Sequence, residues 1–181
     1  MKLLFLPIDI NLENFSFSQK EDPEKNNVFN PWWNSTLINE PAVEENNFDK
    51  ILNQLPFTKI TRLFYKTQKI AVSSHVDVMP QMTMEDNEYD HIKLNEPCGY
   101  RIVINGSLDT LKILNNKSWI TASLPKTPCC YVLNSTELYH SVESDPFRET
   151  IYIRGFLDQQ KHKLLLEKSF KKFKNYAIYQ P

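Results

Sequence analysis

The sequence predicts a single domain of mainly β structure (α+β) with flanking helices. From residue 57 onward, short stretches with strand-like alternation recur at about ten-residue spacing, separated by polar turns such as Asn115-Asn116 and Asn134-Ser135. A helical period of apolar residues occurs in only two places. The chain has 181 residues with 11 Pro and 3 Gly, which suits one loop-rich domain. Together these observations indicate a sandwich or a barrel.

The charge and hydropathy of the chain argue against several classes of partner. Twenty-one basic and 22 acidic residues give a net charge of −1, so we expect no general attraction to nucleic acid or to an anionic membrane. No apolar run approaches the roughly 18 residues that a membrane span needs, and the apolar residues 3–10 are predicted to form a first strand. The three cysteines are predicted to be buried, reduced thiols of a cytoplasmic protein: Cys98, Cys129 and Cys130.

The N-terminal extension, residues 1–56, is polar and rich in turns over much of its length. Its adjacent tryptophans, Trp32 and Trp33, are either a hydrophobic plug on a sheet or a wall of a substrate pocket, which makes Trp32 a candidate substrate contact. A short amphipathic helix is predicted within 44–55 and ends at Pro56, because four apolar residues follow the helical period: Phe48, Ile51, Leu52 and Leu55.

The predicted strand 69–78 carries two candidate metal ligands. Because successive side chains of a strand point to opposite faces, His75 and Asp77 share one face, with Cα atoms about 7 Å apart. The opposite face is apolar enough to be buried, and it consists of Ile70, Val72, Val76 and Val78. The imidazole and the carboxylate can bind one metal ion if a third ligand arrives from elsewhere in the chain.

Two later strands repeat the division into an apolar and a mixed face. In the strand 100–105, Arg101 and Asn105 share the mixed face. In the strand 148–156, Ile151 and Ile153 lie opposite a polar face made of Arg148, Thr150, Tyr152 and Arg154. Two arginines on one face of a core strand need an anionic partner, because an unpaired buried guanidinium is unfavourable.

Two other segments have a predicted character. Residues 79–97 form a long acidic loop, which makes this segment a candidate lid, and His91 lies in it. A loop histidine of this kind is usually only solvated. Residues 158–176 are predicted to form a helix with a lysine-rich outer face and an apolar stripe that contains Leu166, Phe170 and Phe173.

The order His75-x-Asp77, a distal His140, and then Arg148-x-Thr150 resembles the motif of the 2-oxoglutarate/Fe(II)-dependent dioxygenases. Two imidazoles and one carboxylate leave coordination positions open for a co-substrate and O₂, which suits Fe(II). An arginine supplies a planar fork for a remote carboxylate. Within this superfamily, residues 99–156 are most similar to the aspartyl/asparaginyl β-hydroxylase group, which includes bacterial proline hydroxylase-like enzymes.

The resemblance implies a fold and a set of roles. The fold would be a double-stranded β-helix (jelly-roll or cupin-like) with its core at about residues 57–157. The iron ligands, which are also the catalytic residues, would be His75, Asp77 and His140. The C5 carboxylate of 2-oxoglutarate would bind Arg148 and the Thr150 hydroxyl, with Arg154 as the other candidate anchor. The candidate substrate contacts are Arg101, which matches the arginine that meets the substrate carboxylate in this group, together with Asn105 and Trp32.

The implied activity is hydroxylation of an amino-acid or peptidyl side chain (Asp-, Asn- or Pro-like), with decarboxylation of 2-oxoglutarate to succinate. The substrates would be O₂ and a small molecule or a peptide.

The residues themselves leave other interpretations open. The triad also fits a cupin-like metal protein that uses no 2-oxoglutarate, and His75 and His140 also fit the core of a non-catalytic β-barrel binding protein. Nucleic-acid demethylation is disfavoured by the near-neutral charge.

Overall fold

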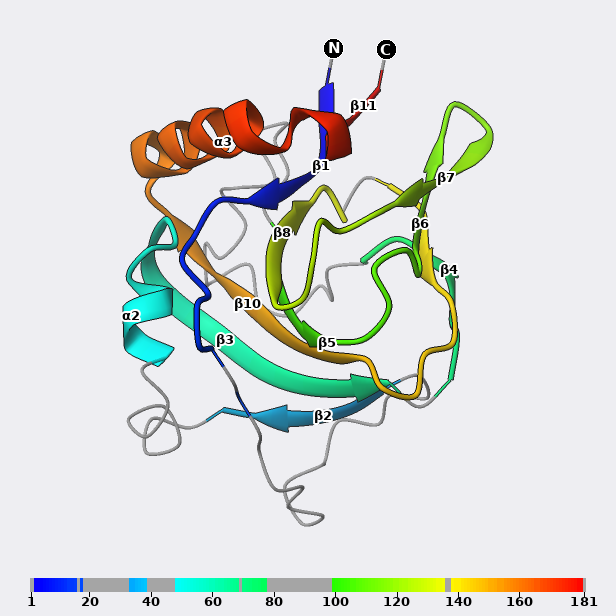
Figure 1. Ribbon diagram of the computed structural model, residues 1–181, viewed down its shortest axis with the longest axis horizontal. Helices are drawn as coiled ribbons and strands as arrows, with labels where there is room; N and C mark the ends of the chain where they lie inside the picture. The colour runs from blue at the N-terminus through cyan, green and yellow to red at the C-terminus, as the bar shows by residue number, and fades with distance from the viewer. Residues whose placement is uncertain are drawn as a thin grey trace, which may run out of the picture.

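The computed structural model describes residues 2–15, 17, 33–38, 48–68, 70–77, 99–135 and 138–180. Over these residues the protein is mainly β, with two open antiparallel sheets and few helices (Figure 1). The larger sheet, in the order β11-β1-β8-β5-β10-β3-β2, contains β1 (Lys2–Ile8), β2 (Trp33–Leu37), β3 (Phe57–Gln68), β5 (Gly99–Asn105), β8 (Cys129–Leu133), β10 (Glu149–Leu157) and β11 (Ile178–Gln180). The smaller sheet, in the order β4-β9-β6-β7, contains β4 (Val72–His75), β6 (Leu111–Asn115), β7 (Ser118–Ala122) and β9 (His140–Val142). The helical elements are α2 (Phe48–Leu52), α3 (Gln159–Phe173) and the 3₁₀ turn η2 (Lys174–Tyr176).

The strands β3 to β10 form one long antiparallel ribbon. β3 pairs with β10, β4 with β9, β5 with β8, and β6 with β7. The ribbon turns back at the β6–β7 hairpin, where Asn116 and Lys117 have φ values of 47° and 70°, both positive as a type I′ turn requires. Successive pairs of the ribbon alternate between the larger and the smaller sheet. The ribbon therefore winds around the space between the two sheets.

Each face of the larger sheet has its own apolar core. The outer face packs against the helices through a buried cluster that includes Tyr100, Ile102, Ile151, Ile153, Phe48, Ile51, Leu165 and Leu166. The inner face packs against the smaller sheet through Val103, Tyr131, Leu133, Leu111, Ile113 and Val142. The predicted faces of the strands 100–105 and 148–156 are therefore confirmed, and so is the buried face of the helix at Phe48 and Ile51.

β10 and β3 approach each other closely at Gly155. The pairing register shifts between Arg154 and Gly155. A Cβ atom at Gly155 would lie 2.8 Å from the Cα of Ile60 and would also collide with the carbonyl oxygen of Lys59. A residue without a side chain is required there because the two backbones leave no room for one.

The predicted alternation along residues 69–78 is only partly correct, because Val72 and Val76, both predicted on the face opposite His75, line the same cavity as His75. β4 pairs Val72 with Val142 and His75 with His140, so three steps along β4 match two steps along β9. This β-bulge turns Val72 to the same side as His75. Val72 is buried and lines a cavity together with His75, whereas Ile70, predicted to be buried, is 54% exposed. An extra residue in one strand moves the side chains that precede it to the opposite face of the sheet.

Helix α3 buries the predicted stripe only in part: Leu166 is buried and Phe173 packs against the core, but Phe170 does not. Asp158 caps it by accepting a hydrogen bond from the Lys161 N–H (2.9 Å). The buried residues of α3 are His162, Leu165, Leu166 and Ser169, while Phe170 is 39% exposed. The Ser169 hydroxyl accepts a hydrogen bond from the N–H of Asp9, which draws this polar residue inward in place of Phe170. The strands β2 and β11 were not predicted.

The two described cysteines are buried thiols, as predicted. Burial raises the pKa of the Cys129 thiol to about 12 and that of Cys130 well above its ordinary value, so both are unreactive. No helix in the described part of the chain is long and apolar enough to cross a membrane. Cys98, Trp32, the loop 79–97 and His91 lie outside the described residues.

Candidate metal centre

The structure brings His75, Asp77 and His140 together at one point between the sheets. His75 ends β4 and His140 begins β9, and the two residues are direct partners across the strand pair. Their rings lie 4.3 Å apart, centroid to centroid. Asp77 follows β4 and is held by a hydrogen bond from its own N–H to the Ser135 carbonyl (2.8 Å). One ligand atom from each of the three residues lies within 4.8 Å of the others.

Both histidines have the same ring nitrogen bound to the backbone. His75 Nδ1 lies 2.7 Å from the Ser73 carbonyl oxygen, and His140 Nδ1 lies 3.1 Å from the Leu138 carbonyl oxygen. A carbonyl only accepts, so each Nδ1 carries a proton, and Nε2 presents a lone pair to a metal when the ring is neutral. These backbone bonds fix ring tautomer and orientation, as is usual for metal-binding histidines.

The two oxygens of Asp77 face different partners. Oδ1 lies 3.4 Å from Nε2 of His75 and 3.7 Å from Nε2 of His140. Oδ2 accepts a hydrogen bond from Nη2 of Arg101 at 2.9 Å and lies 3.7 Å from Nη2 of Arg154. The arginines therefore orient the carboxylate so that the other oxygen points at the two imidazoles. Two nitrogen lone pairs and an anionic oxygen converge on one point, an arrangement that a cation stabilises.

The titration behaviour of the three groups fits this geometry. Burial opposes ionisation of Asp77, but the hydrogen bond with His75 and the charge of Arg101 outweigh it, so the pKa of Asp77 lies well below its ordinary value. Burial and the charge of Arg101 lower the pKa of His140 to about 4, which keeps its ring neutral at pH 7. Burial lowers the pKa of His75, but its hydrogen bonds with Asp77 and the Ser73 carbonyl more than compensate and raise it.

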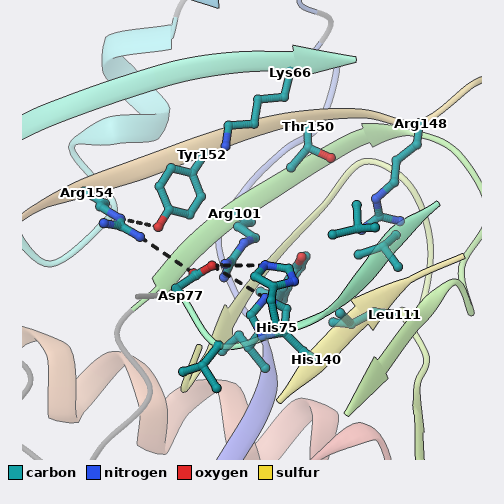
Figure 2. A pocket seen from close by; sticks show the side chains of 15 residues that line it. Lys66, His75, Asp77, Arg101, Leu111, His140, Arg148, Thr150, Tyr152 and Arg154 are labelled. Atoms are coloured by element: carbon teal, nitrogen blue, oxygen red, sulfur yellow. Dashed lines mark hydrogen bonds and ion pairs between the residues drawn. The ribbon is translucent and has the colours of Figure 1, made fainter. Parts of the chain in front are cut away.

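The triad opens into a cavity of about 250 Å³ between the sheets, close to the lower end of the range for small-molecule sites (Figure 2). In Figure 2, Tyr152 and Arg154 lie on one side of the triad and Arg148 on the other. The polar residues that line the cavity beside the triad are Lys66, Arg101, Tyr131, Arg148, Thr150, Tyr152 and Arg154. Its apolar lining consists of Val72, Val76, Leu111, Leu133 and Val142.

Arg148 and Thr150 carry buried polar atoms without a partner. Arg148 is 2% exposed, and its Nη1 donates a hydrogen bond to the Thr110 hydroxyl (2.7 Å). Its Nε and the hydroxyl oxygen of Thr150 make no hydrogen bond in the described structure. The nearby carboxylate of Asp145 accepts hydrogen bonds from the backbone N–H groups of Ser107 (2.6 Å) and Phe147 (3.0 Å). Buried polar atoms of this kind are normally satisfied, so a bound water or ligand is expected to contact them.

Most of the predicted site residues meet in this cavity. It is lined by seven of them: His75, Asp77, Arg101, His140, Arg148, Thr150 and Arg154. Asn105 is not brought there: it is exposed at the end of β5, and its Oδ1 accepts a hydrogen bond from the Gly106 N–H (2.9 Å). Trp32 lies outside the described residues.

The sequence reasoning missed Lys66 and gave no role to Tyr152. Residues 66–68 are all polar and resemble a connection between two strands, but β3 continues through Gln68, and Lys66 pairs with Thr150 across the strands. That pairing places Lys66 beside the polar face of β10. Residues 64–68 read Phe-Tyr-Lys-Thr-Gln and show no polar–apolar alternation, so the sequence carries no local signal for Lys66.

No family model matches this chain, and no curated protein matches it.

Proposed function

We propose that this protein is an Fe(II)- and 2-oxoglutarate-dependent dioxygenase that hydroxylates an amino-acid or peptidyl side chain. One observation carries the proposal: a two-histidine, one-carboxylate set and a buried arginine with an orphan donor line the same cavity. The first group of residues matches a ferrous ion, and the second matches the far carboxylate of 2-oxoglutarate.

The strand order supports a double-stranded β-helix. If β3 to β10 are numbered one to eight, strand one pairs with eight, two with seven, three with six, and four with five. A ribbon whose pairs alternate between two facing sheets is what a jelly roll requires, and this supports the proposed fold. In this numbering His75 ends the second strand, Asp77 follows it, and His140 begins the seventh.

The triad fits Fe(II) by donor type and number. Two neutral imidazoles and one carboxylate bind a ferrous ion without filling its coordination sphere. Arg101 holds Asp77 by its other oxygen, and the Ser73 and Leu138 carbonyls hold the imidazoles. The iron would be held by three side chains whose orientations are fixed before it binds.

Arg148 fits the co-substrate better than Arg154 does. The Arg148 Nε and the Thr150 hydroxyl have no partner in the described structure, and a carboxylate would satisfy both atoms. Arg154 already donates from Nε to the Tyr152 hydroxyl and lies beside Asp77. Leu111 and Val142 also line the cavity and would keep water away from the bound chain of the co-substrate.

When bound together, iron and 2-oxoglutarate supply the oxidising chemistry, in which the co-substrate becomes succinate and CO₂ and oxygen from O₂ enters the substrate as hydroxyl. The chain's own residues bind the metal and the co-substrate, orient them, and exclude water. His75, Asp77 and His140 hold the metal, and Arg148 anchors the remote carboxylate so that the reactive end points toward the triad. The apolar lining limits water around the site.

The test is succinate formation by the full-length protein supplied with Fe(II), 2-oxoglutarate and O₂, with free amino acids and short peptides screened as substrates. Asp77→Ala should abolish metal-dependent succinate formation because one of the three ligands is gone. Asp109→Ala is the matched control, since this carboxylate is exposed in a turn far from the triad in sequence. Equal turnover by wild type and Asp77→Ala would refute the proposed metal site.

A further inference from the structure

The hydroxyl of Thr110 holds the guanidinium of Arg148 from the opposite sheet. It accepts a hydrogen bond of 2.7 Å from Nη1 of Arg148, and the two residues are only 5% and 2% exposed. Thr110 directly precedes β6 of the smaller sheet, and Arg148 directly precedes β10 of the larger sheet. The bond therefore joins the two sheets on the side of the triad where Arg148 lies (Figure 2).

The backbone is fixed at both ends of this bond. The carbonyl of Thr110 accepts a hydrogen bond from the N–H of Glu143 (2.9 Å). The N–H of Arg148 donates to the Asp145 carbonyl (3.0 Å), and its carbonyl accepts from the N–H of Gln68 (3.1 Å). The Thr110 hydroxyl is thus a fixed acceptor against which the long side chain of Arg148 is oriented.

The partner of the Arg148 guanidinium is neutral. No carboxylate in the described part of the chain forms an ion pair with Arg148. The oxygens of Asp145, which lies nearby, accept hydrogen bonds from the backbone N–H groups of Ser107 and Phe147. A carboxylate at position 110 would compete with an anionic ligand for the guanidinium, whereas a hydroxyl orients the group and leaves its charge for the ligand.

Thr110 acts through Arg148, because it is not among the residues that line the cavity, whereas Arg148 is. With Nη1 bound to Thr110, the buried Nε of Arg148 still lacks a partner, and so does the buried hydroxyl of Thr150. We propose that Thr110 is a positioning residue for the co-substrate, because its hydroxyl directs the remaining donors of Arg148 toward the C5 carboxylate of 2-oxoglutarate. The inference rests on the proposed function, which assigns Arg148 to that carboxylate.

The experiment is an anaerobic calorimetric titration of 2-oxoglutarate into the full-length, Fe(II)-loaded protein. Thr110→Val keeps the branched shape but removes the acceptor, and it should weaken 2-oxoglutarate binding about five- to tenfold, as the loss of one oriented hydrogen bond does. Thr110→Ser keeps the hydroxyl and should bind within about twofold of wild type. The affinity for Fe(II) should be unchanged in both variants. Wild-type binding of 2-oxoglutarate by Thr110→Val would overturn the proposal.

A matched control comes from another threonine of the smaller sheet. The Thr121 hydroxyl, on the exposed strand β7, accepts a hydrogen bond of 2.9 Å from Nζ of Lys112. Thr121→Val therefore removes the same kind of bond, from a cation to a threonine, away from the cavity, and it should leave 2-oxoglutarate binding unchanged. If Thr110→Val fails to fold, Thr110→Ala compared with Thr110→Ser tests the hydroxyl with smaller side chains.

A double-mutant cycle separates positioning from general support of the fold. If Thr110 acts through Arg148, Thr110→Val should cause no further loss of 2-oxoglutarate binding when it is added to Arg148→Met. A purely structural role would weaken binding by the same factor in both backgrounds, and that result would overturn the inference.

The same titrations distinguish this inference from the proposed function. If 2-oxoglutarate binding requires Arg148 but is the same in wild type and Thr110→Val, the inference is wrong and the dioxygenase proposal stands. If wild type binds neither Fe(II) nor 2-oxoglutarate, the dioxygenase proposal falls, and the role given to Thr110 falls with it.

Discussion

Asp77 divides its two oxygens between two tasks. Oδ1 faces the imidazoles, and Oδ2 is held by Arg101. A ligating carboxylate that is anchored by its other oxygen loses little rotational freedom when a metal binds, so the site is largely preorganised. The same bond explains why Arg101 tolerates burial, since an unpaired guanidinium there would be unfavourable.

Arg148 and Arg154 differ in a way that variants can measure. Arg148→Met should raise the 2-oxoglutarate concentration needed for half-maximal succinate formation at least tenfold, because a charge-assisted hydrogen bond contributes about 1.5–3 kcal/mol. Arg154→Met should raise it less than about threefold, since Arg154 is engaged with Tyr152 and Asp77. Titration of the co-substrate under steady-state conditions checks this. The reverse ranking would move the anchor to Arg154.

Lys66 should reduce the stability of the metal-free protein at neutral pH. Its pKa falls from 10.5 to about 8 through burial and the charge of Arg101, with Arg154 adding to the effect and Asp77 opposing it. A base whose pKa is lowered by folding destabilises the folded state below the folded pKa, and the penalty disappears as the pH rises to the unfolded pKa. Lys66→Met should therefore be more stable than wild type by about 2 kcal/mol at pH 7.

The pH profile is the sharper part of this prediction. The advantage of Lys66→Met should be constant below about pH 8 and should shrink toward zero as the pH approaches 10.5. Urea denaturation at several pH values measures it. An advantage that is the same at pH 7 and pH 10.5 would show that Lys66 is not the titrating group.

At the scale of the strand, the contact of β10 with β3 depends on Gly155. A methyl group there would meet the backbone of Ile60 at 2.8 Å, and backbone atoms cannot move aside as a flexible side chain can. Gly155→Ala should destabilise the protein by about 2–3 kcal/mol, the usual range for overpacking. Urea denaturation checks this, with Ser118→Ala on the exposed strand β7 as control and an expected change within about 0.5 kcal/mol. Equal midpoints for the two variants would contradict the close approach.

The alternation of polar and apolar residues predicted the facing of β5 and β10, but for β4, which carries His75, it predicted the strand and not its facing throughout. β5 and β10 run through the centre of the larger sheet with one face against the helices, so their faces follow from the period of two. The facing of β4 depends on a bulge against β9, which no pattern within residues 69–78 encodes. His75 and Asp77 meet His140 as predicted, while Val72 and Val76 line the cavity contrary to prediction.

Other differences between the predicted and the observed structure have local causes. Asn105 was predicted on the same strand face as Arg101. However, β5 ends at Asn105, and the Asn105 side chain accepts a hydrogen bond from the following turn. Lys66 resembles a turn residue in the sequence because two more polar residues follow it. The edge strands β2 and β11 carry no long alternation of their own and are fixed by pairing with β3 and β1. Pairing between distant segments is the information that a single sequence supplies least.

At the scale of the whole molecule, the ribbon places ligands that are far apart in the chain on neighbouring strands. β4 and β9 are adjacent only because the ribbon from β3 to β6 pairs in reverse order with β7 to β10. The same winding brings the polar face of β10 over the triad, so that the metal ligands and the arginines line one cavity. The helices cover the opposite face of the larger sheet, so the face that lines the cavity is free to carry the site residues.

The most direct measurement is an anaerobic titration of Fe(II) and 2-oxoglutarate into the full-length protein, followed by visible absorption. We expect a weak metal-to-ligand charge-transfer band in wild type and in Asp109→Ala, because iron held by the triad leaves positions open for the co-substrate. The band should be absent in His140→Ala, which lacks one of the ligands. No band in wild type, with no iron retained, would contradict the dioxygenase account and leave His75 and His140 as structural residues of a binding protein.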